Sequence, residues 1–316
     1  MATDVQEIEQ NFPGYKETAR EIGKQLSLRK KLLVRRIFLL IWPIMVLAVA
    51  SVIVSESYKA GWLQKDGPYT AGLLVVGGAW FCFSFCYYAV LSLIFNIEKL
   101  IWVDSFFDKR NLEPKDSWRI ARKLFWPYFR LGIETFVRYV LPAFILFFLS
   151  FFLIIKYLVG GTMADAAYIP VVAIVIVTGA IIIYFYLLQV ILRYLPFVFL
   201  DRYGEQNFSY SGLFVEMRKL KTVAANKTQM RALLTHLTAD VVTEISSTAL
   251  GVMQAGLGNF GIVGKILGSS VRVVGEETTK QITSLGRIVA VYMVYQFVRQ
   301  QMYGQAQHVN ENLYRL

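Results

Sequence analysis

Charged residues are scarce in this chain. Only 17% of its 316 residues are Asp, Glu, Lys or Arg, against about 25% in a typical soluble domain. Apolar residues make up 56% of the sequence. With so few charged residues, a single soluble domain could not hide this much apolar surface from water. We therefore expect lipid to be the main solvent of the chain.

Histidine and cysteine are also rare, with two of each. Neither His236 nor His308 has a metal-ligand neighbour in the sequence, and Cys82 and Cys86 lie one helical turn apart in an apolar run. Two thiols alone make a poor zinc site, so we interpret both as buried, reduced thiols. The sequence also lacks the motifs HExxH, GxSxG and GxxxxGK[ST]. We therefore expect no metal, no cofactor and no catalytic residues, and the chain is not predicted to be an enzyme.

Long apolar runs dominate the first two thirds of the chain. A membrane helix needs about 20 apolar residues, and four runs approach or exceed this length, near residues 37–54, 70–95, 132–155 and 168–192. They predict an all-α, polytopic membrane protein with four transmembrane helices. The alternative is a set of core helices in a large soluble protein, and the chain is not polar enough to cover such a core.

The basic residues alternate between the segments that separate these runs. Residues 1–36, 96–131 and 193–231 together hold 23 Lys and Arg, whereas residues 55–69 and 156–167 hold three. Because basic loops stay on the cytoplasmic side, this pattern predicts cytoplasmic N- and C-termini in a bacterial inner membrane or an organelle membrane. The net charge of +11 is then mostly a topology signal, and we expect no nucleic-acid partner.

Two of the basic segments are predicted to form amphipathic helices in the inner headgroup layer. Pro114 and Asp116 suit the start of the first helix, and Ser209 suits the N-cap of the second. Apolar residues then recur at helical spacing, and ordinary solvated loop helices are the alternative. The basic side chains expected to contact lipid or a partner are Arg119, Arg122 and Lys123 in the first helix and Arg218, Lys219 and Lys221 in the second.

Two further features lie close to the start of the third span. Pro127 is expected to break or kink the helix before the span. Glu134 and Arg138 are four residues apart, which allows an ion pair on one helix face. We interpret this possible intramembrane pair as a structural pair at the membrane boundary, with a coupling site for transport as the alternative.

The last third of the chain is rich in glycine and mixes polar with apolar residues. It is predicted to form either two poor spans packed in a bundle or a re-entrant or interfacial hairpin. Gly264 and Gly268 form a GxxxG pattern, which lets helix backbones approach closely. The stretch "GLGNFG", Gly256–Gly261, matches a dinucleotide-binding pattern, but a helical sequence precedes it where that site needs a strand. We therefore assign these glycines to helix packing and expect no cofactor.

Two stretches resemble known families. The phrase "RYLPFVFLDRYG" and the order of spans and basic loops over residues 37–230 resemble multi-span bacterial membrane domains of unknown function, such as the membrane domain of some glycerophosphodiester phosphodiesterases. The stretch "GIVGKILGSSVRVVGEETTKQITSLGRIVAVY", Gly261–Tyr292, resembles a membrane domain associated with bacterial GTPases. Both resemblances imply a helical membrane fold, and neither implies an active site.

These patterns divide the chain into a basic amphipathic arm (1–36), a four-span membrane domain (37–231) and a Gly-rich helical region (232–316). We expect a structural or assembly subunit of a membrane complex, whose partners are membrane lipids and either other proteins or further copies of the chain. The alternatives are a transporter or channel for a lipid or small solute, and a membrane enzyme without a recognisable active site.

Overall fold

The computed structural model describes residues 15–62, 67–107, 112–160, 168–223 and 226–303, and all regular secondary structure in these residues is helical. The predicted all-α class is therefore confirmed. The helices divide into two compact units that are described separately below.

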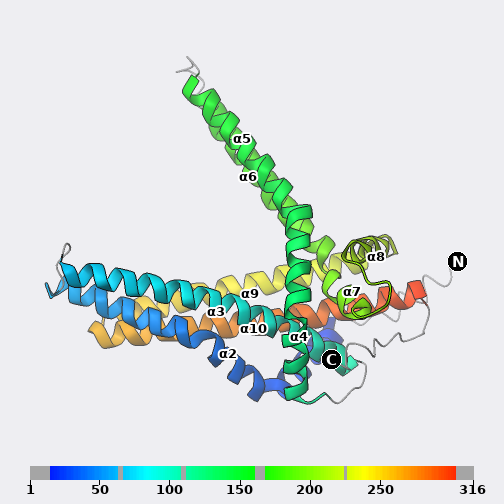
Figure 1. Cartoon of the computed structure of the whole chain (residues 1–316), viewed down its shortest axis with the longest axis horizontal. Helices are drawn as coiled ribbons and strands as arrows, with labels where there is room; N and C mark the ends of the chain where they lie inside the picture. The colour runs from blue at the N-terminus through cyan, green and yellow to red at the C-terminus, as the bar shows by residue number, and fades with distance from the viewer. Residues whose placement is uncertain (1–14, 63–66, 108–111, 161–167, 224–225, 304–316) are drawn as a thin grey trace. The chain divides into compact units, whose positions relative to one another are not determined.

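The first unit comprises residues 1–122 and 230–297. Its four long helices run side by side (Figure 1). They are α2 (Tyr15–Lys59), α3 (Pro68–Phe107), α9 (Asn226–Gly258) and most of α10 (Gly261–Tyr303). Side-chain contacts between α2 and α3, and between α9 and α10, join residues in antiparallel order, whereas those between α3 and α10 are in parallel order. The unit is therefore a four-helix bundle built from two antiparallel hairpins.

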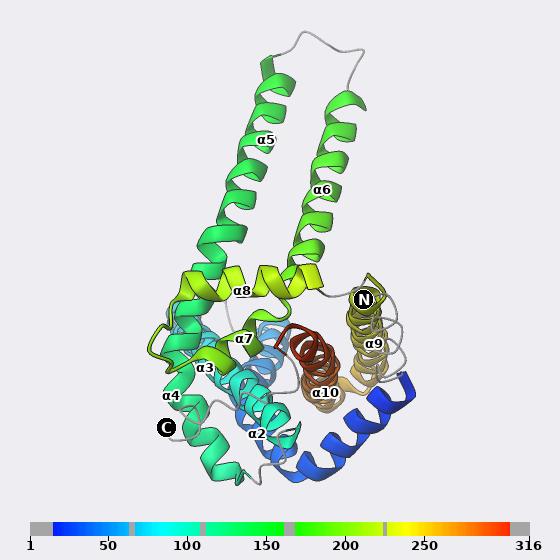
Figure 2. The ribbon, with the colours of Figure 1, turned by 90° about the vertical axis from the view of Figure 1, so that its right-hand side faces the viewer.

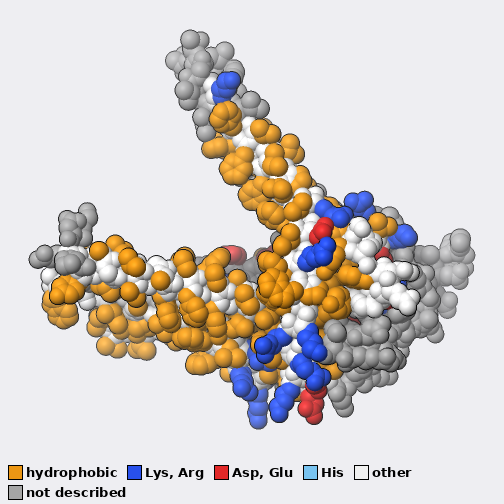
Figure 3. Space-filling view, viewed as in Figure 1, with side chains coloured by type: hydrophobic (Ala, Val, Ile, Leu, Met, Phe, Trp, Pro, Cys, Tyr) orange, Lys and Arg blue, Asp and Glu red, His pale blue; other side chains and the backbone are white. Residues whose placement is uncertain are grey.

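The two ends of α3 have opposite environments. Near its start, Leu74 and Val75 are each 72% exposed, whereas Ile97 and Val103 near its end are fully buried. Hydrophobic side chains cover the outward face of α3 in Figure 3. One end of the bundle thus has an ordinary packed core, and the rest presents apolar side chains outward.

A tight turn joins α9 to α10. The amides of Asn259 and Phe260 donate to the carbonyls of Gly256 and Leu257, and Gly261 has a φ of 73°. This left-handed conformation strains other residues, which explains a glycine at the first position of α10. The GLGNFG stretch is therefore a helix–helix turn preceded by a helix.

The second unit comprises residues 123–229 and 298–316. It holds the later part of α4 (Pro114–Thr135), a π-helical turn (Phe136–Val140), and α5 (Leu141–Gly160), α6 (Tyr168–Leu192), α7 (Leu195–Arg202) and α8 (Tyr210–Val223). Figure 2 shows α5 and α6 as two neighbouring helices. The Tyr184 hydroxyl of α6 donates to the Tyr139 carbonyl over 2.7 Å.

Three helical stretches are long and apolar enough to cross a bilayer, by length and composition, within the described residues. They are Ala19–Lys59, Tyr69–Phe107 and Pro114–Phe152. In α6, which corresponds to the fourth predicted span, the stretch found is the shorter Ile174–Tyr184. Three of the four predicted spans therefore overlap such a stretch, and each stretch begins before the apolar run that predicted it.

The break expected at Pro127 is not found, because α4 continues through it to Thr135. A proline removes one backbone donor, but the rest of the helix supplies the other hydrogen bonds. The irregular turn comes later, at Phe136–Val140, where the helix widens to π geometry. The basic amphipathic segment and the third apolar run therefore form one continuous helical rod.

Candidate functional site: buried polar networks and two basic helices

A charged pair lies at the packed end of the first unit. The Arg36 guanidinium donates through Nε to Glu98 Oε2 over 3.0 Å and through Nη2 to Glu98 Oε1 over 3.1 Å. The Ser117 hydroxyl donates to the same carboxylate over 3.2 Å and accepts from the Trp102 indole over 2.9 Å. The guanidinium also lies 3.7 Å from the Trp118 ring centre. The Glu98 carboxylate, fully buried, is thus held by α2 and α4 together.

A second network joins α3 to α10. Lys99 Nζ donates to Gln281 Oε1 over 2.8 Å and to Ser284 Oγ over 2.7 Å. The Gln281 amide donates to Glu277, whose other oxygen accepts from the Tyr88 hydroxyl over 2.9 Å. The amide of Gln281 therefore bridges a buried ammonium and a buried carboxylate, and each of its ends is paired with the charge that it suits.

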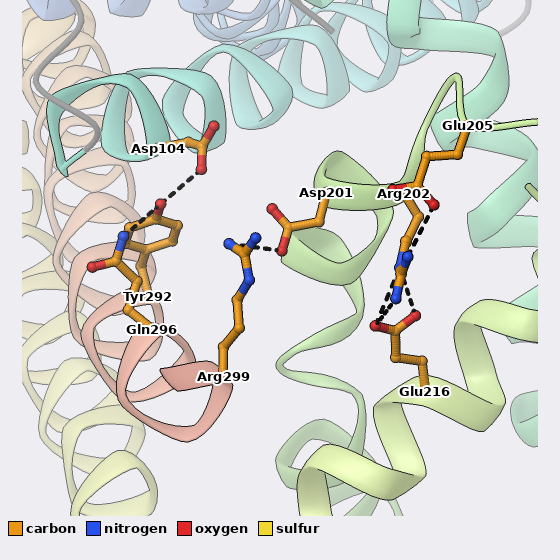
Figure 4. Close-up of polar contacts among 8 residues, drawn as sticks. All are labelled: Asp104, Asp201, Arg202, Glu205, Glu216, Tyr292, Gln296 and Arg299. Atoms are coloured by element: carbon orange, nitrogen blue, oxygen red, sulfur yellow. Dashed lines mark hydrogen bonds and ion pairs between the residues drawn. The ribbon is translucent and has the colours of Figure 1, made fainter. Parts of the chain in front are cut away.

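Figure 4 shows a third contact between α3 and α10. The Tyr292 hydroxyl donates to Asp104 Oδ1 over 2.7 Å and accepts from the Gln296 amide over 3.0 Å. Both Asp104 and Tyr292 are buried. Because a buried polar group without a partner costs free energy, these matched contacts favour a single register of the two helices.

The second unit has its own charged cluster, also shown in Figure 4. The guanidinium of Arg202 donates to both carboxylate oxygens of Glu216 over 2.9 to 3.2 Å and to Glu205 over 3.0 Å. Hydrogen bonding to Glu216 raises the pKa of Arg202 above its ordinary value. Nearby, Arg299 pairs with Asp201 over 3.2 Å and connects the end of α10 to α7. These pairs hold α8 and the last residues of α10 against α7.

The basic residues predicted on α4 are exposed, as an amphipathic helix requires. Arg119 pairs with Asp116 over 3.2 Å, while Arg122 makes no ion pair within the described residues. Lys123 is also exposed. Figure 3 shows Lys and Arg side chains gathered around the first turns of α4. The apolar stripe of this helix, by contrast, is buried in the protein at Ala121 and elsewhere.

The second predicted amphipathic helix is α8. The Gly212 amide donates to the Ser209 hydroxyl over 3.1 Å, so Ser209 is the N-cap of α8, as predicted. Its apolar stripe, including Phe214 and Met217, is buried. Arg218 and Lys219 are exposed, whereas the side chain of Lys221 lies outside the described set.

Glu134 and Arg138 form the ion pair that their spacing allows. Arg138 Nε lies 3.3 Å from Glu134 Oε2, and the two side chains are partly exposed. The guanidinium of Arg138, which lies in the π-helical turn, is also 4.8 Å from the ring centre of Phe214. An irregular turn with a partly exposed pair suits a structural contact between the π-helical turn (Phe136–Val140) and α8 as well as a site of motion.

Gly264 and Gly268 pack against α9 of the same chain. A Cβ at Gly264 would overlap the Leu257 carbonyl, and a Cβ at Gly268 would lie 3.1 Å from the Gln254 oxygen. Both glycines are buried. The sequence did not single out Gly275, where a Cβ would lie 2.6 Å from Leu250. The close helix approach is thus within one hairpin.

The sequence reasoning missed the buried networks around Glu98 and Lys99, because it counted Lys99 as a loop charge. A signal was available, because apolar residues stand directly before and after these two charges, at Ile97 and from Leu100 to Val103.

Cys82 and Cys86 correct a second expectation. Both thiols are reduced but exposed on α3, since they lie where this helix faces outward.

These arrangements are suited to holding helices together. Within the described residues, no group of three or more His, Cys, Asp or Glu side chains is placed to bind a metal ion. Comparison of the chain with protein-family models, with curated proteins and with solved structures gives no match. The proposals that follow rest on the sequence and the geometry described above.

Proposed function

We propose that this chain is an integral membrane protein that acts as a structural or assembly subunit of a membrane complex. The observation that carries the proposal is the exposed apolar surface of long helices whose opposite ends are packed and charged. At about 1.5 Å per residue, α3 is about 60 Å long, roughly twice the thickness of a hydrocarbon core. Its apolar half fits the bilayer, and its packed half extends into the cytoplasm.

The structural role is supported by the way the charges are used. The buried carboxylates of Glu98 and Glu277 each have fixed partners on another helix. Such contacts specify the register of helices, because a slip of one turn would leave charges buried without partners. A rigid bundle with a preset register is suited to presenting surfaces to other molecules.

Two surfaces are available for those contacts. The exposed basic residues of α4 and α8 suit anionic headgroups, at about 1 kcal/mol per Lys or Arg. On α9, exposed apolar residues such as Val241 and Ile245 alternate with the exposed carboxylate of Glu244. A surface of this mixed character suits a protein partner or another copy of the chain, since neither lipid nor water solvates all of it well.

The native cysteines test the membrane placement directly. Cys82 and Cys86 are exposed on α3, so in water both thiols would react with a polar maleimide. In lipid the reactive thiolate is disfavoured and the polar reagent has no access. We expect no labelling of native membranes, even when opened to both sides, and full labelling after denaturation in SDS.

A matched control uses Trp62, which is 82% exposed just beyond the end of α2. In a Cys82→Ser/Cys86→Ser background, Trp62→Cys should be labelled readily in sealed cells or right-side-out vesicles. Rapid labelling of Cys82 in folded protein within membranes would contradict the membrane placement.

The assembly role has its own test. Native mass spectrometry of the chain in mild detergent should give a mass above that of one chain.

Transport is the second candidate function. The observation that favours it is the continuous hydrogen-bonded series Tyr88, Glu277, Gln281 and Lys99, which connects ionisable groups along the inside of the bundle. Ionisable residues inside membrane bundles often form relays for ions or protons. Flux measurements on liposomes distinguish the two functions.

A further inference from the structure

A cavity of about 600 Å³ lies in the first unit, between the end of α2 and the α9–α10 hairpin. This volume is within the range of small-molecule sites. The cavity is at the opposite end of α2 from its basic N-terminal residues. Six polar side chains carry the argument that follows, and they are Ser55, Glu56, Lys59, Gln254, Lys265 and Arg272.

The cavity lining carries more positive than negative charge. Glu56 is shared by two ammonium groups, with Lys265 Nζ at 2.8 Å and Lys59 Nζ at 3.2 Å from the same oxygen. An ammonium has three donors, and this contact uses one from each lysine. One positive charge of the pair is therefore not compensated by Glu56, and its donors are available to a ligand.

Arg272 is held in position beside these lysines. Its Nε donates to Glu276 over 2.8 Å and its Nη1 donates to Gln254 over 3.0 Å. Glu276 in turn accepts a hydrogen bond from the Ser247 hydroxyl of α9 over 3.0 Å. Two contacts fix the plane of the guanidinium, and further N–H groups remain for a bidentate contact with an anion.

The cavity lining also includes apolar side chains. Val52 of α2 and Ala255 of α9 lie among the lining residues. A ligand that fits this lining has an anionic head for the basic groups and an apolar part for these side chains.

We propose that this cavity binds the phosphate headgroup of an anionic phospholipid. Lys265 and Arg272 contact the phosphate, Lys59 adds positive charge, and Ser55 offers a hydroxyl to the rest of the headgroup. The start of the acyl chains lies against Val52 of α2 and Ala255 of α9. The choice of a lipid as the source of the phosphate rests on the proposed membrane placement.

The test is native mass spectrometry of the purified full chain in mild detergent, with phosphatidylglycerol, phosphatidylcholine or inorganic phosphate added. We expect retained phosphatidylglycerol, little phosphatidylcholine and no displacement by millimolar phosphate. Lys265→Gln/Arg272→Gln should retain one lipid fewer and bind at least about tenfold more weakly, because two charge-assisted contacts are lost. Lys280→Gln, an exposed lysine of the same helix outside the cavity, is the matched control.

Arg272→Lys keeps the positive charge, so it should retain more of the lipid binding than the double variant does. It also tests the site if the double variant fails to fold. Equal retention of both lipids, or unchanged binding by a folded double variant, would overturn the proposal. Displacement of the lipid by phosphate would also overturn it, in favour of a free-anion site. The binding assay uses solubilised protein, whereas the Cys82 assay uses membranes, so failure of the lipid site and failure of the membrane placement give different results.

Discussion

Arg36 and Glu98 are 62 residues apart in the chain, yet two hydrogen bonds of 3.0 and 3.1 Å join them between α2 and α3. Glu98 is fully buried and the Arg36 side chain is 12% exposed. A carboxylate in this position is tolerable only with its partners in place, so the pair fixes which turn of α2 faces which turn of α3.

Glu98→Leu should lower the stability of the first unit by about 3–5 kcal/mol, because the Arg36 guanidinium would lose its carboxylate partner in a largely buried position. Arg36→Met/Glu98→Leu should recover most of this loss, since an apolar pair needs no partner. Thermal unfolding of the purified chain in detergent measures both. A double variant as unstable as the single one would contradict the assignment.

Gly264→Ala should destabilise the α9–α10 hairpin by about 1–3 kcal/mol, because the added methyl group overlaps the Leu257 carbonyl. Gly256→Ala is the control, since a Cβ there meets no atom within 4 Å. Its unfolding temperature should stay constant or rise slightly, because alanine favours helix over glycine. A Gly264→Ala chain with unchanged stability but altered oligomeric mass would show that this glycine faces a partner instead.

Arg122→Gln should weaken contact with anionic lipid more than Arg119→Gln does. Asp116 already compensates Arg119, whereas the Arg122 charge is available to headgroups. The expected loss is about 1 kcal/mol for Arg122 and less for Arg119. The number of phosphatidylglycerol molecules retained after detergent exchange measures it. Cys82 should stay protected from maleimide in both variants, and new labelling would indicate that insertion itself depends on the basic face.

Glu277→Gln and Lys99→Met separate a scaffold from a transporter. In a scaffold both variants should lower the unfolding temperature, because Lys99→Met removes the donor to the Gln281 amide and Glu277→Gln replaces one of the two buried acceptor oxygens by a donor. Proteoliposomes of the unmodified chain with an internal pH dye should then show no flux above that of empty liposomes. A flux that the unmodified chain supports and Glu277→Gln abolishes would favour transport.

Much of the local structure follows from the order of residues alone. Apolar runs of about 20 residues predict helices, because in lipid the backbone must satisfy its own hydrogen bonds. The N-cap Ser209 and the start of α4 at Pro114 were predictable for a similar reason, since capping depends on residues within one turn. The basic faces of α4 and α8 are likewise a property of helical spacing.

The bundle itself could not be predicted in this way. The last third of the chain mixes polar and apolar residues, which left hairpin and poor spans as equal alternatives. Folding places α9 and α10 beside α2 and α3, where Glu277 meets Tyr88 and Lys99 meets Gln281. Contacts between residues more than 180 positions apart depend on which helices become neighbours, and one helix's periodicity carries no such information.

The sequence by itself thus determined the helical class, the apolar runs and the alternation of strongly and weakly basic segments, because these depend on composition and on spacing within a few turns. Only the tertiary structure decided that Glu98 and Lys99 are buried, that Gly264 packs against its own chain, and that Lys59, Lys265 and Arg272 line one cavity. Whether a side chain is buried, and which side chains line one cavity, depends on which helices pack together. Such packing brings residues together that are far apart in the sequence.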